Sequence, residues 1–195
     1  IMAELKKLGL DKNTVVVLLG DHGWSLGDHN QWCKHSNFNI VNNAPLIIKV
    51  PGNQKKGAEP KVVEFVDVYP TLCEAVGLPV PHHTEGESMM KLMTGEDKSW
   101  KDCAIIKWHS GVTYFDRDYG YTQWNDKAGN FQGHMLFLYR NDHLETKNVA
   151  DAPENKEIVA QLQKEILARR GKDFMKQVPK ADKPERKGTQ AHKRK

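Results

Sequence analysis

The sequence contains no long hydrophobic run. Its longest uninterrupted apolar stretch extends only from Val15 to Leu19, whereas an α-helix needs about 20 apolar residues to cross a bilayer. The first eight residues, IMAELKKL, have neither the apolar core nor the cleavage pattern of a secretory signal peptide. The sequence therefore predicts no membrane span and leaves the compartment unknown. Because the chain begins with Ile1 rather than Met, we expect its start to be missing.

Cysteine is also scarce. The three residues, Cys33, Cys73 and Cys103, are odd in number and widely spaced. A disulfide framework uses an even number of cysteines at short spacings, and zinc sites use closely paired ligands. The sequence therefore predicts neither a disulfide scaffold nor a zinc site.

The net positive charge is confined to the end of the chain. Residues 172–195 carry nine Lys or Arg and three Asp or Glu, a net charge of +6, and the rest carries 20 and 22, a net charge of −2. The segment is poor in apolar residues and contains Pro and Gly, so we predict a disordered basic tail. Such a tail can touch nucleic acid or an anionic surface, but it is more often only a solubilising end. We therefore predict no nucleic-acid partner.

The first part of the chain alternates helical and strand-like segments. A helical stripe of apolar residues covers 2–8. Residues 15–19 and 44–50 are apolar and rich in β-branched side chains, which is typical of strands covered on both faces, as in a parallel sheet. We therefore predict an α/β domain over residues 1–102.

Two more helices are predicted within this α/β domain. The longer one begins at Asp67 and ends at Gly77, with Leu72, Val76 and Cys73 on its buried face. A shorter helix follows in the sequence GESMMKLMTG.

The pattern changes near Cys103. The segments CAIIKWHSGVTYF, GYTQW and HMLFLYRND combine aromatic and β-branched residues with polar breaks, which predicts short antiparallel strands joined by turns. A final amphipathic helix is predicted to end at Gly171, with Ile158, Leu162 and Ile166 on its apolar face. We therefore predict a small antiparallel subdomain with a helix over residues 103–171.

Reactive side chains follow directly after the first predicted strand. Asp21 and His22 come one residue after it, between two glycines, and Lys34 and Trp24 lie nearby in the sequence. Ligands of parallel α/β sheets bind at the carboxyl ends of the strands. A carboxylate and an imidazole can ligate one cation, and a lysine can meet an anionic oxygen. These residues indicate a site for a sulfate or phosphate ester.

Each of these residues also has a purely structural interpretation. Asp21 can cap a turn, His22 can be a hydrogen-bonded structural histidine, and Lys34 can be solvated. Trp24 and Trp32 can belong to the core. The residues alone leave both interpretations open.

The stretch LLGDHGWSLGDHNQWCKHSNFNIVNNAPLIIKVPG resembles the second signature region of the sulfatase family, in the branch that includes iduronate-2-sulfatase. The segments DVYPTLCEAVGLPVP, YGYTQW and LYRNDHLETKNVAD resemble its later helix and C-terminal subdomain. The resemblance extends over residues 1–170. It implies an alkaline-phosphatase-like α/β fold with a small antiparallel β subdomain and a C-terminal helix.

The resemblance also implies roles for the residues after the first strand. Asp21 and His22 would ligate a divalent cation, usually Ca²⁺ with Mg²⁺ as the other choice, although imidazole is an unusual calcium ligand. Lys34 would be catalytic, holding the sulfate oxygens, and Trp24 would line the pocket for a sulfated sugar or another sulfate ester. Relatives are usually exported. They hydrolyse sulfate esters with a formylglycine made from Cys or Ser, whose hydrate attacks sulfur.

The sequence departs from the family at the nucleophile. The motif Cys-x-Pro-Ser-Arg is absent, because none of the three cysteines is followed by Pro-Ser-Arg at the required spacing. The paired aspartates that complete the metal site in relatives are also absent. We therefore expect a C-terminal fragment, with the formylglycine upstream, that is inactive alone. Two alternatives are a phosphoesterase or phosphonate hydrolase of the alkaline phosphatase superfamily and a non-catalytic module that binds an anion or metal.

Overall fold

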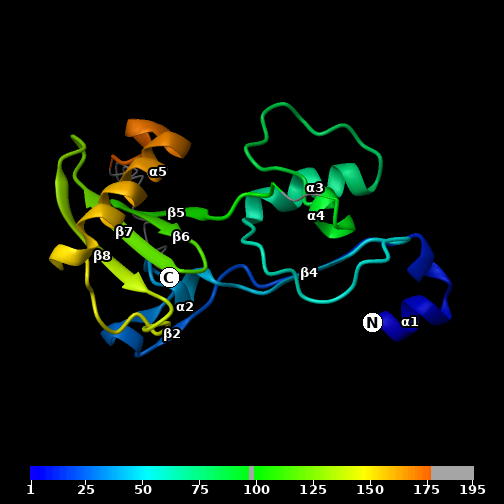
Figure 1. The fold of residues 1–195 in the computed structure, drawn as a ribbon. Coiled ribbons are helices and arrows are strands. Elements are labelled where there is room, and N and C mark those ends of the chain that lie inside the picture. Colours follow the sequence, from blue (N-terminus) through cyan, green and yellow to red (C-terminus); the bar gives the residue numbers. More distant parts are fainter. Residues whose placement is uncertain (97–98, 177–195) are drawn as a thin grey trace, which may run out of the picture.

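The computed structural model describes residues 1–96 and 99–176. Figure 1 shows an elongated molecule, with the large sheet and a long helix at one end and a thin ribbon carrying the N-terminal helix at the other. The large sheet has four strands and the ribbon has two. A lobe of short helices lies beside the ribbon. None of the described helices is long and apolar enough to cross a membrane. Most of the predicted basic tail, residues 177–195, lies outside the described residues.

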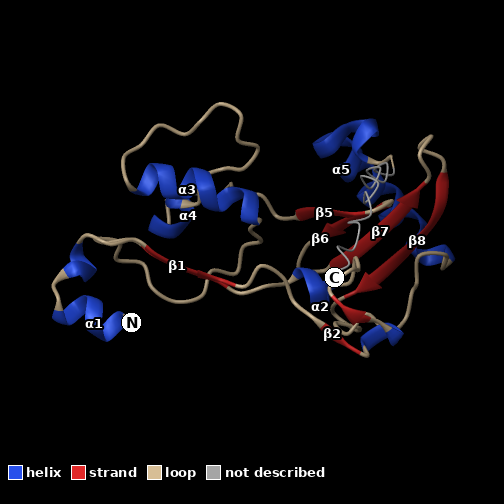
Figure 2. Cartoon of the chain, turned by 180° about the vertical axis from the view of Figure 1, so that it is seen from behind, coloured by secondary structure: helices blue, strands red, loops and turns tan. Residues whose placement is uncertain are grey.

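The part of the chain that precedes the large sheet consists of short elements, coloured by type in Figure 2. These elements are α1 (Met2–Lys7), η1 (Leu10–Lys12), β1 (Val16–Leu19), β2 (Ser25–Leu26), η2 (Asp28–Asn30), β3 (Trp32–Cys33), α2 (Asn39–Asn42), β4 (Leu46–Lys49), η3 (Phe65–Asp67), α3 (Val68–Ala75) and α4 (Met90–Thr94).

The ribbon of β1 and β4 corrects one prediction. The two strands exist where the sequence predicts them, but they pair antiparallel, with Val16 opposite Lys49 and Leu19 opposite Leu46. They are not covered on both faces, since Leu18 is 57% exposed and Ile47 is 62% exposed. The predictions of parallel pairing and of full burial are therefore wrong for this chain. An apolar run indicates that a strand is suited to burial, but it does not specify the direction of its partner.

The lobe of η3, α3 and α4 has a small core of its own. Met89, Leu92 and Trp100 are buried there, and the Trp100 indole N–H donates to the Val62 carbonyl over 2.8 Å. The helix α3 ends just before Gly77, as predicted, and its Cys73 is buried.

Two details of α3 differ from the prediction. The side chain of Asp67 makes no capping bond to α3; it forms a capping box with Glu64 around η3 instead. Val76 is 56% exposed rather than part of the buried face. It lies just beyond the last residue of α3, where the chain has already left the helical geometry.

The antiparallel subdomain is confirmed. Four strands pair in sequence order as consecutive antiparallel neighbours, and α5 lies across one face of the sheet (Figure 1). The elements are β5 (Ala104–Trp108), β6 (Gly111–Phe115), β7 (Tyr119–Asn125), β8 (Phe131–Leu138), η4 (Pro153–Asn155) and α5 (Lys156–Phe174). The regular helical backbone of α5 stops at Gly171, as predicted, because Gly171 has a non-helical backbone with a φ of 72°. The last residues of α5, up to Phe174, follow across this kink.

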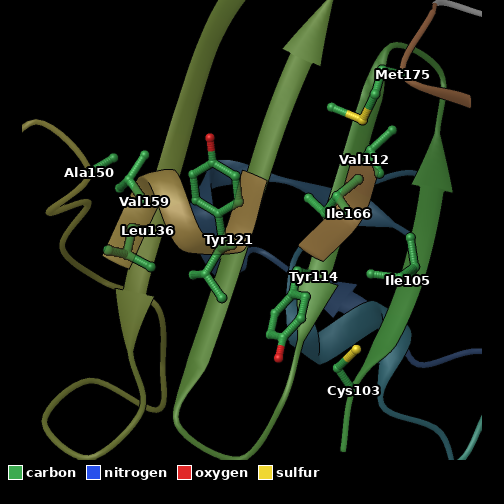
Figure 3. Close-up of a cluster of buried hydrophobic side chains, with 11 residues drawn as sticks. Cys103, Ile105, Val112, Tyr114, Tyr121, Leu136, Ala150, Val159, Ile166 and Met175 are labelled. Atoms are coloured by element: carbon green, nitrogen blue, oxygen red, sulfur yellow. The ribbon is translucent and has the colours of Figure 1, made fainter. Parts of the chain in front are cut away.

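The main core lies between this sheet and α5. Figure 3 shows Val112, Tyr121 and Leu136 of the strands meeting Val159 and Ile166 of the helix. Four of these side chains, Val112, Tyr121, Leu136 and Ile166, are fully buried. Burying apolar surface of this kind contributes about 25 cal/mol per Å². The subdomain therefore provides a rigid support against which the preceding segment can be positioned.

Candidate active site

The Gly-Asp-His-Gly sequence is held at the end of β1 by contacts that only glycine permits. The Gly20 N–H donates to the Pro45 carbonyl over 3.0 Å, and the Gly23 N–H donates to the Val41 carbonyl over 2.7 Å. A Cβ atom on Gly23 would lie 2.0 Å from the Ile40 carbonyl oxygen. The backbone around Asp21 and His22 is thus fixed against α2, because any larger residue at position 23 would clash.

The imidazole of His22 is oriented by its own neighbour. Its Nδ1 lies 2.7 Å from the Gly23 carbonyl oxygen. Because a carbonyl only accepts hydrogen bonds, Nδ1 carries the hydrogen and donates it. In the neutral ring Nε2 is then left as a lone-pair donor, which is the arrangement typical of metal-binding histidines.

The Nε2 atom of His22 faces two of the other three predicted site residues, Asp21 and Lys34. It lies 3.2 Å from Oδ2 of Asp21 and 2.7 Å from Nζ of Lys34, which donates to it. The structure therefore brings together a carboxylate, an imidazole and an ammonium group, although Lys34 is 12 residues from His22 in the sequence.

Asp21 and His22 fit part of a cation site. The 3.2 Å between Oδ2 and Nε2 matches the spacing of two adjacent ligands that each lie about 2.2 Å from one cation. Within residues 1–96 and 99–176, however, no group of three or more His, Cys, Asp or Glu side chains could hold a metal ion. These two residues can therefore supply only part of a complete ligand set.

Lys34 and Trp24 flank the β2–β3 hairpin. In that hairpin Ser25 pairs with Cys33, and Cys33 has a left-handed backbone with a φ of 73°. The Trp24 ring is 48% exposed, and its centroid lies 5.8 Å from that of His22. The exposure of Trp24 argues against its structural alternative as a core residue. Its role in lining a substrate pocket stays a prediction.

The chain that follows Lys34 is anchored on the C-terminal sheet. The Asn37 side chain, which is buried, donates to the Thr113 hydroxyl over 2.9 Å, and Thr113 lies 2.9 Å from the hydroxyl of Thr122. These partners lie far apart in the sequence, and no local pattern indicates the contact. The anchor fixes Lys34 because only two residues separate it from Asn37.

A buried carboxylate provides a second anchor. Glu145 accepts the Asn39 N–H over 2.8 Å and the Tyr139 hydroxyl over 2.9 Å. Burial raises the pKa of Glu145, although both hydrogen bonds oppose the shift. Burial and the nearby Glu145 charge also raise the pKa of the Tyr139 hydroxyl. The sequence analysis did not identify this pair.

A cavity of about 830 Å³ lies beside Asp21 and His22. Its wall includes Asp116, Arg117 and His143 from the C-terminal subdomain, whereas Trp24 and Lys34 are not part of its lining. The sequence analysis missed these three wall residues. The only local signal is the charged turn Asp116–Arg117–Asp118 between two strands. The arrangement as a whole can bind an anion beside a cation.

The chain has the alkaline-phosphatase-like fold that the resemblance implies, because solved sulfatase structures match it over most of its length. The family model of N-sulphoglucosamine sulphohydrolase, C-terminal, matches residues 27–172. The chain therefore belongs to the sulfatase family, in the C-terminal part that this model describes.

Curated relatives support the same family. The chain is 31% identical over 163 residues to Delta 4,5-hexuronate-2-O-sulfatase of Bacteroides thetaiotaomicron, which covers 77% of this chain and 33% of that protein. It is 32% identical over 106 residues to iduronate 2-sulfatase of Homo sapiens, covering 42% of this chain and 19% of the relative. The chain thus spans a third or less of the length of these two relatives.

Solved structures agree on the fold. A 2-O GAG sulfatase matches with a TM-score of 0.70 and 29% identity, over 85% of this chain and 39% of the other. A phosphonate monoester hydrolase from Silicibacter pomeroyi matches with a TM-score of 0.78 and 24% identity, over 88% and 37%. At that identity the second match shows the fold alone.

Proposed function

We propose that this chain forms the part of a sulfuric ester hydrolase that supplies cation ligands and a sulfate-binding lysine, and that the intact enzyme hydrolyses sulfated sugars. The observation that carries the proposal is the meeting of three groups at His22 Nε2, with Asp21 Oδ2 at 3.2 Å and Lys34 Nζ at 2.7 Å. This triad suits a negatively charged ester beside a cation.

Asp21 and His22 would hold the cation, which we propose to be Ca²⁺ or Mg²⁺. When bound, the cation would polarise the sulfate group and stabilise negative charge on its oxygens. The Gly23 carbonyl holds the His22 ring in one orientation through Nδ1. The ring therefore need not reorient to present Nε2, so this part of the site is preorganised.

Lys34 would act on the sulfate itself. Its ammonium group carries three donors on a flexible stem, so it can leave His22 Nε2 and donate to a sulfate oxygen. In that position it stabilises the negative charge that develops on the leaving oxygen as the ester breaks. Trp24, exposed beside His22, would form one wall of the sugar pocket.

The nucleophile is proposed to come from outside residues 1–195, because no Cys-x-Pro-Ser-Arg motif occurs in them. Sulfated sugars are the proposed substrates because the names of the relatives, a hexuronate-2-O-sulfatase and an iduronate 2-sulfatase, describe that substrate class. No specific observation favours a phosphonate ester or a purely binding role over this proposal.

The first test is a chimera. The matching C-terminal third of the Bacteroides thetaiotaomicron relative is replaced by residues of this chain, and turnover of a sulfated unsaturated disaccharide is measured. We expect the chimera to be active and the isolated chain to be inactive. Lys34→Met is expected to lower kcat by roughly 10²–10³, the usual cost of losing one group that stabilises developing charge.

A matched control separates the role of Lys34 from a general effect of charge. Lys56 is exposed and is not among the residues that line the cavity beside Asp21 and His22, so Lys56→Met should leave kcat unchanged. Equal losses in the two variants would contradict the assignment of Lys34. Turnover by the isolated chain that disappears in Asp21→Ala would show that the nucleophile lies within residues 1–195.

A further inference from the structure

A second cavity lies at the opposite end of the C-terminal sheet from the candidate active site. The first cavity meets the end of β6 at Phe115 and the chain after β8 at Tyr139, whereas the second meets the end of β7 at Asn125 and the start of β8 at Phe131. The second cavity measures about 620 Å³, which is within the size range of small-molecule sites. Its lining includes Gln123, Asn125, Phe131, Gln163, Leu167 and Lys172.

A chain of side-chain amides leads from the core to this cavity. The amide nitrogen of Gln163 donates to the Tyr121 hydroxyl and to Oε1 of Gln123, over 2.9 Å each. The Gln123 amide in turn donates to Oδ1 of Asn125 over 2.8 Å. Each bond fixes the orientation of the next amide, because an amide oxygen only accepts and an amide nitrogen only donates.

The orientation of this chain leaves hydrogen-bond donors at the cavity. The oxygen of Asn125 is occupied by Gln123, and within the described residues its amide nitrogen has no acceptor. Asn125 is buried, with 4% of its surface exposed, and it lines the cavity, so its unpaired amide donor borders this space. A β-bulge between Trp124 and Asn125 shifts the register at this point, and bulges often redirect a side chain towards a ligand.

The other walls of the cavity are aromatic and positively charged. The ring of Phe131 is 54% exposed at the rim. Lys176 is paired with Asp173 at 2.7 Å, whereas Lys172 has no ion-pair partner within the described part of the chain. An aromatic face, amide donors and an unpaired ammonium group therefore surround one space.

The turn that borders the cavity is closed by hydrogen bonds to the Asp126 carboxylate. Asp126 accepts the N–H groups of Ala128 over 2.9 Å and Asn130 over 2.8 Å, and the Asn130 side chain over 2.9 Å. The last of these bonds is the largest of the causes that lower the pKa of Asp126. A turn fixed in this way loses little conformational entropy on binding, which favours a preformed site.

We infer that this second cavity binds a saccharide unit that carries a sulfate or carboxylate group. Amide donors match the hydroxyl oxygens of a sugar, and the Phe131 ring can stack on the apolar C–H face of a pyranose. The ammonium group of Lys172 can pair with the sulfate or carboxylate group of the sugar. The site retains a sugar chain away from the point of hydrolysis. It goes beyond the proposed function and is built entirely from residues 121–176.

Binding to the full 195-residue chain tests this inference. A sulfated uronic acid–hexosamine tetrasaccharide and its desulfated form are titrated by calorimetry, with NMR of the side-chain amide groups of Gln123 and Gln163, which line the cavity, as local reporters. We expect the sulfated form to bind and Asn125→Ala to raise its Kd about tenfold. Phe131→Ala should raise the Kd several-fold, since this ring stands at the rim. Lys172→Met should remove the preference for the sulfated form.

Three control variants test whether binding is specific to this cavity. Gln54→Ala removes an exposed amide from the other lobe of the molecule and should leave the Kd unchanged. Leu167→Trp fills the cavity from a 40%-exposed position and should abolish binding while the thermal melt stays cooperative. The chain with both Asp21→Ala and Lys34→Ala should bind normally, which separates this site from the candidate active site.

Three outcomes would overturn the inference. The first is that neither the sulfated nor the desulfated tetrasaccharide binds. The second is binding that persists in both Asn125→Ala and Leu167→Trp. The third is binding that disappears in the variant lacking Asp21 and Lys34, because the sugar would then occupy the candidate active site. A failed active-site proposal, by contrast, would leave tetrasaccharide binding at the second cavity intact.

Discussion

The buried ion cluster around Lys101 gives the sharpest stability prediction. Its Nζ atom lies 2.8 Å from Oε2 of Glu64 and 2.7 Å from Oδ2 of Asp67. Asp67 is 0% exposed and Lys101 has a side chain that is 14% exposed. Lys101→Ala would remove the cation and leave two carboxylates without their main compensation.

The magnitude follows from what remains in the variant. Breaking a buried ion pair by removing one partner typically costs about 3–5 kcal/mol. Asp67 keeps the N–H groups of Glu64 at 2.8 Å and Glu87 at 3.0 Å, and Arg170 lies 3.7 Å from Glu64. Because these contacts still compensate part of the buried charge, we expect a loss of stability at the lower end of this range, about 3 kcal/mol. At about 2–4 °C per kcal/mol for a chain of this size, the melting temperature should fall by roughly 6–12 °C.

Thermal melting followed by circular dichroism measures this loss, with Lys61→Ala as the matched control. Lys61 pairs with Asp102 at 2.9 Å, and the Asp102 side chain is 78% exposed. An exposed pair contributes at most about 1 kcal/mol, so the control should lose less than about 4 °C. Equal losses in the two variants would refute the reasoning. Adding Asp67→Asn to Lys101→Ala should recover part of the loss, because it removes the uncompensated buried charge.

Two further predictions concern pH and association. Burial raises the pKa of Glu145 in the folded state, so the folded chain holds a proton that the unfolded chain releases, and the contribution of Glu145 to stability falls as the pH rises above about 4.5. In urea unfolding at several pH values, Glu145→Gln should therefore gain stability relative to the native chain across that window. A stability difference that does not change with pH would contradict the assignment. Leu18 and Ile47 are 57% and 62% exposed on the β1–β4 ribbon, so the isolated chain is expected to self-associate. Light scattering should show that the double variant Leu18→Lys and Ile47→Lys is more monomeric than the native chain. A native chain that is a monodisperse monomer would count against this expectation.

Much of the subdomain could be predicted from local sequence. Strands β5 to β8 combine β-branched and aromatic residues with polar breaks, and α5 places Leu162 and Ile166 on one face, where the structure buries both. Such patterns depend on residues within a few positions of one another. The candidate site was predicted in part for the same reason, since Asp21, His22 and Trp24 are close neighbours.

The contacts that hold the site were not predictable in this way. Asn37 reaches Thr113 across 76 positions, and the Asn39 N–H reaches Glu145 across 106 positions. Neither partner stands out in the sequence, because a polar residue in a strand or turn is usually solvated. Only folding of the subdomain shows that these groups are buried and paired.

The sequence by itself determined which segments become strands and helices, and which residues after β1 carry reactive groups. The tertiary structure alone decided that β1 and β4 run antiparallel, that Lys34 donates to His22, and that an amide chain from Gln163 ends at an open cavity. The physical reason is that backbone preference and hydrophobic periodicity act locally. Strand partners and buried hydrogen bonds, by contrast, are chosen by the packing of segments that are distant in the chain.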